Sequence, residues 1–72
     1  MSGNMQIGNN IQKYRQHRGI DQQKLADELG IDRTYLSKLE NQKFSPGTGL
    51  MYRICRYFGV ELGEMFYINN SK

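Results

Sequence analysis

Apolar residues recur at intervals of three and four positions along most of the chain, the spacing that places side chains on one face of an α-helix. Three glycines follow such stripes at positions where helices commonly stop: Gly19, Gly30 and Gly59. Asp21 and Asp32 stand just before two of the stripes, where an N-cap is expected. The spacing predicts five helices, near residues 7–18, 22–29, 33–41, 48–58 and 61–66.

The two ends of the chain lack this helical spacing. Residues 1–6 are polar, and we expect them to be disordered or not native to the protein. Residues 67–72 form a tail, and Phe66–Ile68, where the tail begins, is the one stretch that suits a short strand. The sequence therefore predicts an all-α protein: a compact five-helix domain over residues 7–66, followed by a tail with at most a short strand.

Composition narrows the range of functions. A chain of 72 residues has a thin core, since a domain of this size buries only about 60% of its unfolded surface. One Cys and one His cannot supply a disulfide framework or a tetrahedral zinc site, so we expect no metal and no cofactor. No apolar run is long enough to cross a membrane, and an enzyme active site is not expected in so small a core. The net charge of +3 permits a polyanionic partner, although Lys13, Arg18 and Lys24 are expected to be ordinary solvated charges.

Two of the predicted helices are joined by only Gly30 and Ile31, so they must cross steeply, at about 90–120°. A small residue is needed where the second helix passes over the first, and Ala26 supplies it. The turn needs a positive φ, which glycine adopts readily. Leu36 and Leu39 have the spacing that pins the second helix to the core. These requirements are met in register, which predicts a helix-turn-helix.

Residues 22–41, QQKLADELGIDRTYLSKLEN, resemble the helix-turn-helix of the phage Cro/repressor-like (XRE-type) DNA-binding family. The motif matches without gaps, and the resemblance extends back to Ile7 and forward to Phe66. It implies the lambda-repressor-like DNA-binding fold and double-stranded DNA as the partner. In this motif the second helix lies in the major groove, and the outward positions that would read bases are Arg33, Thr34, Ser37 and Lys38.

The resemblance implies further roles. Four residues stand where such domains meet the DNA backbone and are expected to bind phosphates: Gln22, Tyr35, Asn41 and Lys43. Arg15 and Glu40 occupy positions where similar domains have a partly buried ion pair between the first helix and the end of the recognition helix. Gln42 departs from the pattern, because a glycine usually stands there. The turn must therefore hold a glutamine in left-handed backbone or change shape.

One recognition helix reads only about four to six base pairs, so useful specificity needs two half-sites. Four apolar residues near the C-terminus exceed what a thin core needs: Met65, Phe66, Tyr67 and Ile68. They predict a homodimer through the last helix and the tail, with paired strands as one arrangement. A tail that folds back on its own domain is the alternative.

These features favour a sequence-specific transcriptional regulator, a repressor that binds a palindromic operator as a homodimer. We expect a cytoplasmic, DNA-associated protein of bacterial or phage type, with no small-molecule ligand and no membrane contact. The alternative is a protein-interaction module, such as an antitoxin or a regulatory adaptor.

Overall fold

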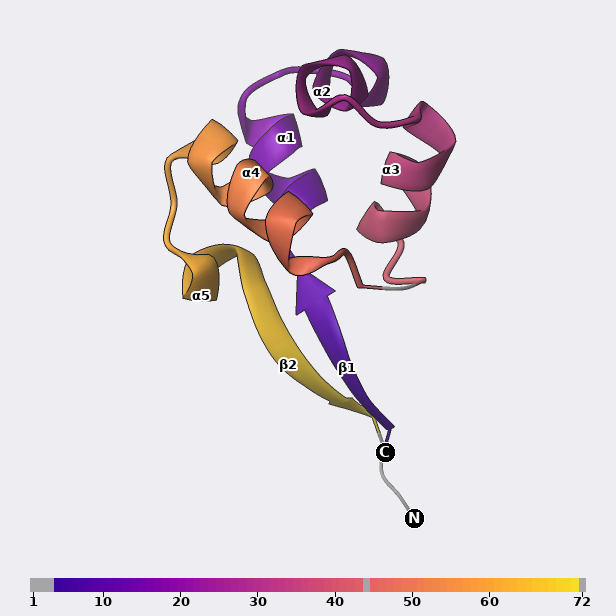
Figure 1. Ribbon diagram of the computed structural model, residues 1–72, viewed down its shortest axis with the longest axis vertical. Helices are drawn as coiled ribbons and strands as arrows, with labels where there is room; N and C mark the ends of the chain where they lie inside the picture. Colours follow the sequence, from indigo (N-terminus) through magenta and orange to yellow (C-terminus); the bar gives the residue numbers. More distant parts are fainter. Residues whose placement is uncertain (1–3, 44, 72) are drawn as a thin grey trace.

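Five helices and a two-stranded ribbon make up the part of the chain that the computed structural model describes, residues 4–43 and 45–71 (Figure 1). Side chains are described for residues 7–43 and 45–68. In chain order the elements are β1 (Asn4–Asn9), α1 (Ile11–His17), α2 (Gln22–Leu29), α3 (Arg33–Glu40), α4 (Thr48–Phe58), α5 (Leu62–Met65) and β2 (Phe66–Ser71).

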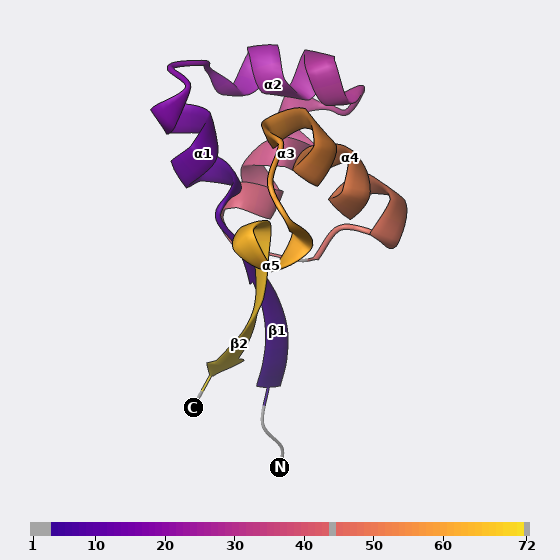
Figure 2. The same cartoon turned by 90° about the vertical axis from the view of Figure 1, so that its left-hand side faces the viewer.

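The two ends of the chain pair with each other. Strands β1 and β2 are antiparallel, with Ile7 opposite Ile68 and Asn9 opposite Phe66, and we call this pair the terminal ribbon. It projects from the helices along the long axis of the molecule (Figures 1 and 2). The tail thus pairs within its own chain, in the manner of the fold-back alternative.

This pairing corrects the prediction for the N-terminal segment. The first helix begins at Ile11, not at residue 7, and residues 4–9 form a strand instead of a disordered end and a helical turn. Ile7 and Ile11 lie four positions apart, but Ile7 packs against the core from the strand and Ile11 from the helix. The partner of β1 lies about sixty residues away, so local periodicity could not reveal it. Residues 1–3 lie outside the described residues.

Gly8 is placed where β1 needs a residue without a side chain. Its cross-strand neighbour is Tyr67, and a Cβ on Gly8 would lie 2.4 Å from Tyr67 Cε1. The tyrosine ring therefore packs directly over the glycine backbone, a known way of supporting a glycine in a strand.

The core lies where the five helices meet and closes at the base of the ribbon. Each of the five helices contributes at least one of the core's fully buried large side chains: Ile11, Leu25, Leu36, Leu39, Ile54 and Met65. Ala26, Leu29, Cys55, Phe58 and Phe66 complete the core with at most 7% exposure. Phe58 is also the centre of a small aromatic cluster, with Tyr57 5.0 Å and Tyr14 5.9 Å away between ring centroids.

Two arginine side chains cap the C-terminal ends of helices α4 and α2. Arg18 lies over the Phe58 ring, 5.1 Å from its centroid, and its Nη2 donates to the Phe58 carbonyl at 3.0 Å. It is therefore not the ordinary solvated charge that the sequence predicts. Arg53 Nη2 donates to the Leu29 carbonyl at the end of α2. Cations at these positions satisfy carbonyls that the helix leaves without partners and complement its dipole.

Candidate nucleic-acid interface

Helices α2 and α3 form the tight pair that the sequence predicts. Asp21 caps α2 by accepting from the Lys24 amide at 2.8 Å. Gly30 ends α2 with φ 71°, and the next amide, of Ile31, donates back to the Ala26 carbonyl at 3.0 Å. In Figure 1, α2 is seen almost end-on while α3 runs down the page, so the helices cross steeply. Asp32 stands at the N-cap position of α3, but its side chain makes no capping hydrogen bond, contrary to the prediction.

The outer face of α3 carries the four predicted base-reading residues. Arg33, Thr34 and Lys38 are exposed, and Ser37 is half-buried. The opposite face holds Leu36 and Leu39, which are completely buried. The helix therefore presents a short polar surface while its other side is fixed in the core.

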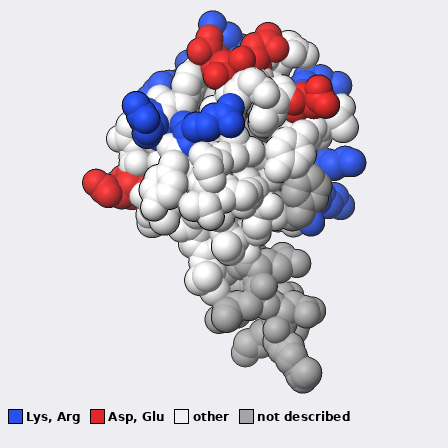
Figure 3. Space-filling view, in the orientation of Figure 1, with Lys and Arg blue, Asp and Glu red and all other residues white. Residues whose placement is uncertain are grey.

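Positive charge gathers beside this face. Figure 3 shows Lys and Arg atoms along the edge formed by α3 and the segment after it, and further Lys and Arg atoms over α4; Asp and Glu atoms lie mainly at the end formed by α2, with one group beside the start of α3. The basic residues of that edge are Arg33, Lys38 and Lys43, all exposed. Glu40, the acidic residue inside α3, is 4% exposed and paired, so it adds little negative field at the surface.

The ion pair expected between Arg15 and Glu40 is present. Arg15 donates through Nε to Glu40 Oε2 at 2.7 Å and through Nη2 to Oε1 at 3.2 Å, a bidentate arrangement. The side chains are 10% and 1% exposed. Gln22 Nε2 also donates to Glu40 Oε1 at 2.9 Å, and Arg15 Nη1 donates to the Ile20 carbonyl at 2.9 Å. One carboxylate thus joins α1, the start of α2 and the end of α3.

The predicted phosphate-binding residues surround the same helix. The Gln22 amide group is directed at Glu40, so one of its two N–H donors is already engaged. Tyr35 is half-buried against the core. Asn41 is exposed, and its Nδ2 lies 3.5 Å from Ser37 Oγ. Lys43 is exposed just beyond the helix.

Gln42 and Asn9 form a contact that the sequence analysis missed. Gln42 adopts φ 63°, the left-handed conformation that its departure from glycine raised as one option. Its Oε1 accepts from the Asn9 amide at 3.1 Å, and its Nε2 donates to the Asn9 carbonyl at 3.2 Å. Asn9, 5% exposed, donates from Nδ2 to the Leu39 carbonyl at 2.9 Å. The unusual glutamine was the available signal, but nothing in the sequence identified Asn9 as its partner.

The four residues predicted for a dimer interface divide into two pairs. Met65 and Phe66 are 0% and 7% exposed in the core of their own domain, so the view that they exceed its needs is wrong. Tyr67 and Ile68 are 41% and 60% exposed. Ile68 borders an apolar groove of about 220 Å³, which Met51 and Leu62 also line.

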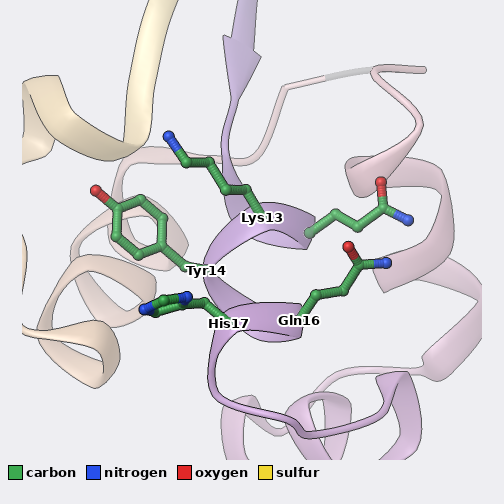
Figure 4. Close-up of a pocket in the computed structure, with 5 residues that line it drawn as sticks. Lys13, Tyr14, Gln16 and His17 are labelled. Carbon is green, nitrogen blue, oxygen red and sulfur yellow. The ribbon is translucent and has the colours of Figure 1, made fainter.

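A surface depression of about 590 Å³ lies over α1 (Figure 4). Lys13, Tyr14 and His17 point to one side of it and Gln16 to the other, so these groups do not converge on one point. Among the described residues no group of His, Cys, Asp and Glu is arranged to hold a metal ion. No helix in the described ranges has the length and apolar character needed to cross a bilayer.

A steeply crossed helix pair with an exposed, basic second helix defines a helix-turn-helix DNA-binding domain. A model of a helix-turn-helix domain family matches residues 8–70. An uncharacterized HTH-type transcriptional regulator of Methanocaldococcus jannaschii is 31% identical over 64 residues, which cover 89% of this chain and 97% of that protein. The ImmF control region 10 kDa protein of Bacillus phage phi105 is 32% identical over 59 residues, covering 82% and 66% respectively.

Among solved structures, the transcriptional regulator VanUg has a similar fold, with a TM-score of 0.77 at 18% identity, covering 99% of this chain and 93% of that one. The chain belongs to the helix-turn-helix family, of the XRE/Cro-like type, and is a DNA-binding transcriptional regulator, not an enzyme.

Proposed function

We propose that the protein is a sequence-specific repressor that inserts α3 into the major groove of DNA and blocks transcription by occupying its operator. The observation that supports this most directly is the two-sided character of α3: Arg33 and Lys38 are exposed on one side, while Leu36 is fixed in the core on the other. A helix held in this way can present its side chains to base edges without reorganisation. Such a regulator acts in the cytoplasm, where the DNA is.

Base recognition is assigned to Arg33, Thr34, Ser37 and Lys38. Arg33 stands in the first turn of α3, the end that contacts bases in this motif. Its guanidinium can donate to O6 and N7 of one guanine, which discriminates against a wrong base by about 1–3 kcal/mol. Thr34 and Ser37 are short enough to contact a thymine methyl or a base edge, and Lys38 reaches a guanine or a neighbouring phosphate.

Phosphate contacts are assigned to the two ends of this surface. At the start of α2, backbone amides without helical partners suit a phosphate oxygen, and Gln22 stands there. Tyr35, Asn41 and Lys43 lie along α3 and just beyond it. Such contacts fix the register of the protein on the duplex but do not specify sequence.

A homodimer on a palindromic operator completes the proposal. Two recognition helices about 34 Å apart read two half-sites on one face of the duplex, and a two-fold interface makes these half-sites inverted repeats. Tyr67 and Ile68 are the exposed apolar side chains of β2 that such an interface can use.

Selection from a random pool of double-stranded DNA tests the proposal. We expect a short inverted repeat to be enriched, with log affinity falling against log salt by about 0.9 for each phosphate neutralised. Arg33→Ala should relax preference at one base position in each half-site. Failure to enrich any sequence, with a protein partner bound over residues 33–38 instead, would favour the interaction-module alternative.

A further inference from the structure

The contact between Gln42 and Asn9 joins the recognition helix to the terminal ribbon. Gln42 lies just past the end of α3, and Asn9 is the last residue of β1, paired with Phe66 at the base of the ribbon. The Gln42 amide group bonds both the N–H and the C=O of Asn9, as a neighbouring strand would. A residue without this side chain could close the turn but could not make these two bonds to the strand.

Left-handed backbone is unfavourable for a glutamine, so the turn itself would be better served by glycine. The surrounding contacts hold it in place. Gln42 Nε2 also lies 3.3 Å from the Glu40 carbonyl, and the Asn9 side chain bridges the Leu39 carbonyl and the Ile11 amide. Non-glycine residues that persist in left-handed backbone cluster where geometry matters for function.

These bonds fix the ribbon relative to α3. In Figure 1, α3 runs along the long axis of the molecule and the ribbon extends further along the same axis. If two copies contact each other through the exposed Ile68 of the ribbon, the same bonds hold α3 in a fixed position relative to that contact in each copy.

We infer that the Asn9–Gln42 pair determines the spacing between half-sites that the dimer accepts, by making the terminal ribbon and α3 one rigid unit. Asn9 and Gln42 are positioning residues in this scheme and touch no base. The inference rests on the proposed function, because it requires two copies on one palindrome. Each base pair inserted between half-sites rotates one of them by about 35° relative to the other, so a rigid dimer accepts one spacing and a loose one accepts several.

The experiment measures affinity for operators whose half-sites are separated by the selected spacing and by one or two base pairs more or fewer. For the wild-type chain we expect a loss of about tenfold at each altered spacing, similar to losing one base contact. Gln42→Gly keeps a residue that suits the turn and removes the side chain. It should reduce that loss to about threefold or less while still binding an isolated half-site.

Ile54→Val serves as the matched control, since it weakens the core in α4 without touching the pair, and it should keep the wild-type spacing profile. A Gln42→Gly profile as sharp as the wild-type profile would overturn the inference and leave the proposed function intact. A wild-type chain that binds half-sites but shows no preferred spacing would overturn the inference together with the proposed homodimer, and would leave only sequence-specific binding by α3. A wild-type chain that binds no DNA would instead overturn the proposed function.

Discussion

Replacing Glu40 with alanine removes the carboxylate that joins three helices. Three hydrogen bonds are lost, two from Arg15 and one from Gln22. The larger effect is that the Arg15 guanidinium, with 10% of its side chain exposed, stays buried without a counter-charge. Breaking a buried pair in this way costs about 3–5 kcal/mol.

The magnitude is large for this chain. At about 0.05–0.15 kcal/mol per residue, 72 residues give a free energy of unfolding of about 4–11 kcal/mol. Glu40→Ala should therefore remove a large fraction of the stability and lower Tm by more than about 12 °C. Urea unfolding followed by far-ultraviolet circular dichroism measures the change.

Glu28→Ala is the matched control. Glu28 pairs with Lys24 at 3.2 Å in α2, but the side chains are 43% and 58% exposed. An exposed pair of this kind contributes about 0.3–0.5 kcal/mol. A loss below about 1 kcal/mol for Glu40→Ala would refute the reasoning, because it would mean that Arg15 recovers its hydration in the folded state.

Three further predictions concern the DNA-facing cations, Gln42 and Cys55. Arg33→Ala should change base preference at one position in fluorescence-anisotropy titrations, whereas Lys43→Ala should weaken all sequences alike and lower the salt slope by about one; equal effects of the two variants would contradict the assignment. Gln42→Gly relieves about 1 kcal/mol of backbone strain but loses three hydrogen bonds of about 1 kcal/mol each and loosens the unfolded chain by about 0.4–1 kcal/mol, so urea unfolding should show a net loss of about 2–3 kcal/mol. Burial, with a smaller contribution from the charge of Glu61, raises the pKa of the Cys55 thiol above its ordinary value of about 8.5. The free energy of unfolding should therefore fall as pH rises past that value, because the thiol of the unfolded chain ionises first. Cys55→Ala should make this fall with pH less steep, and an unchanged pH dependence would count against a buried, protonated thiol.

The helices from α2 to α4 could be predicted from the sequence because their signals are local. Asp21 before α2, Gly30 after it and Gly59 after α4 take the cap positions that their types favour. Apolar stripes between these positions, such as Leu36 with Leu39, identified the buried faces. Each signal lies within a few residues of the element that it defines.

The terminal ribbon could not be predicted in this way. The pairing of Ile7 with Ile68 links positions sixty-one residues apart, and a two-stranded ribbon depends on what it packs against. The four-residue interval from Ile7 to Ile11 was interpreted as one helical face, although two different elements bring these side chains to the core. Periodicity identifies which residues are buried more securely than it identifies the element that buries them.

Gln42 shows what a departure from local preference indicates. A glutamine is a poor choice for left-handed backbone, and the sequence alone offered only the choice between strain and a different turn. In the structure Gln42 keeps the left-handed backbone conformation, and its side chain makes hydrogen bonds to the N–H and the C=O of Asn9. The unfavourable local conformation is thus compensated by a contact thirty-three residues away. Where a residue breaks the local rule in an otherwise consistent motif, the long-range partner of that residue is the feature to look for.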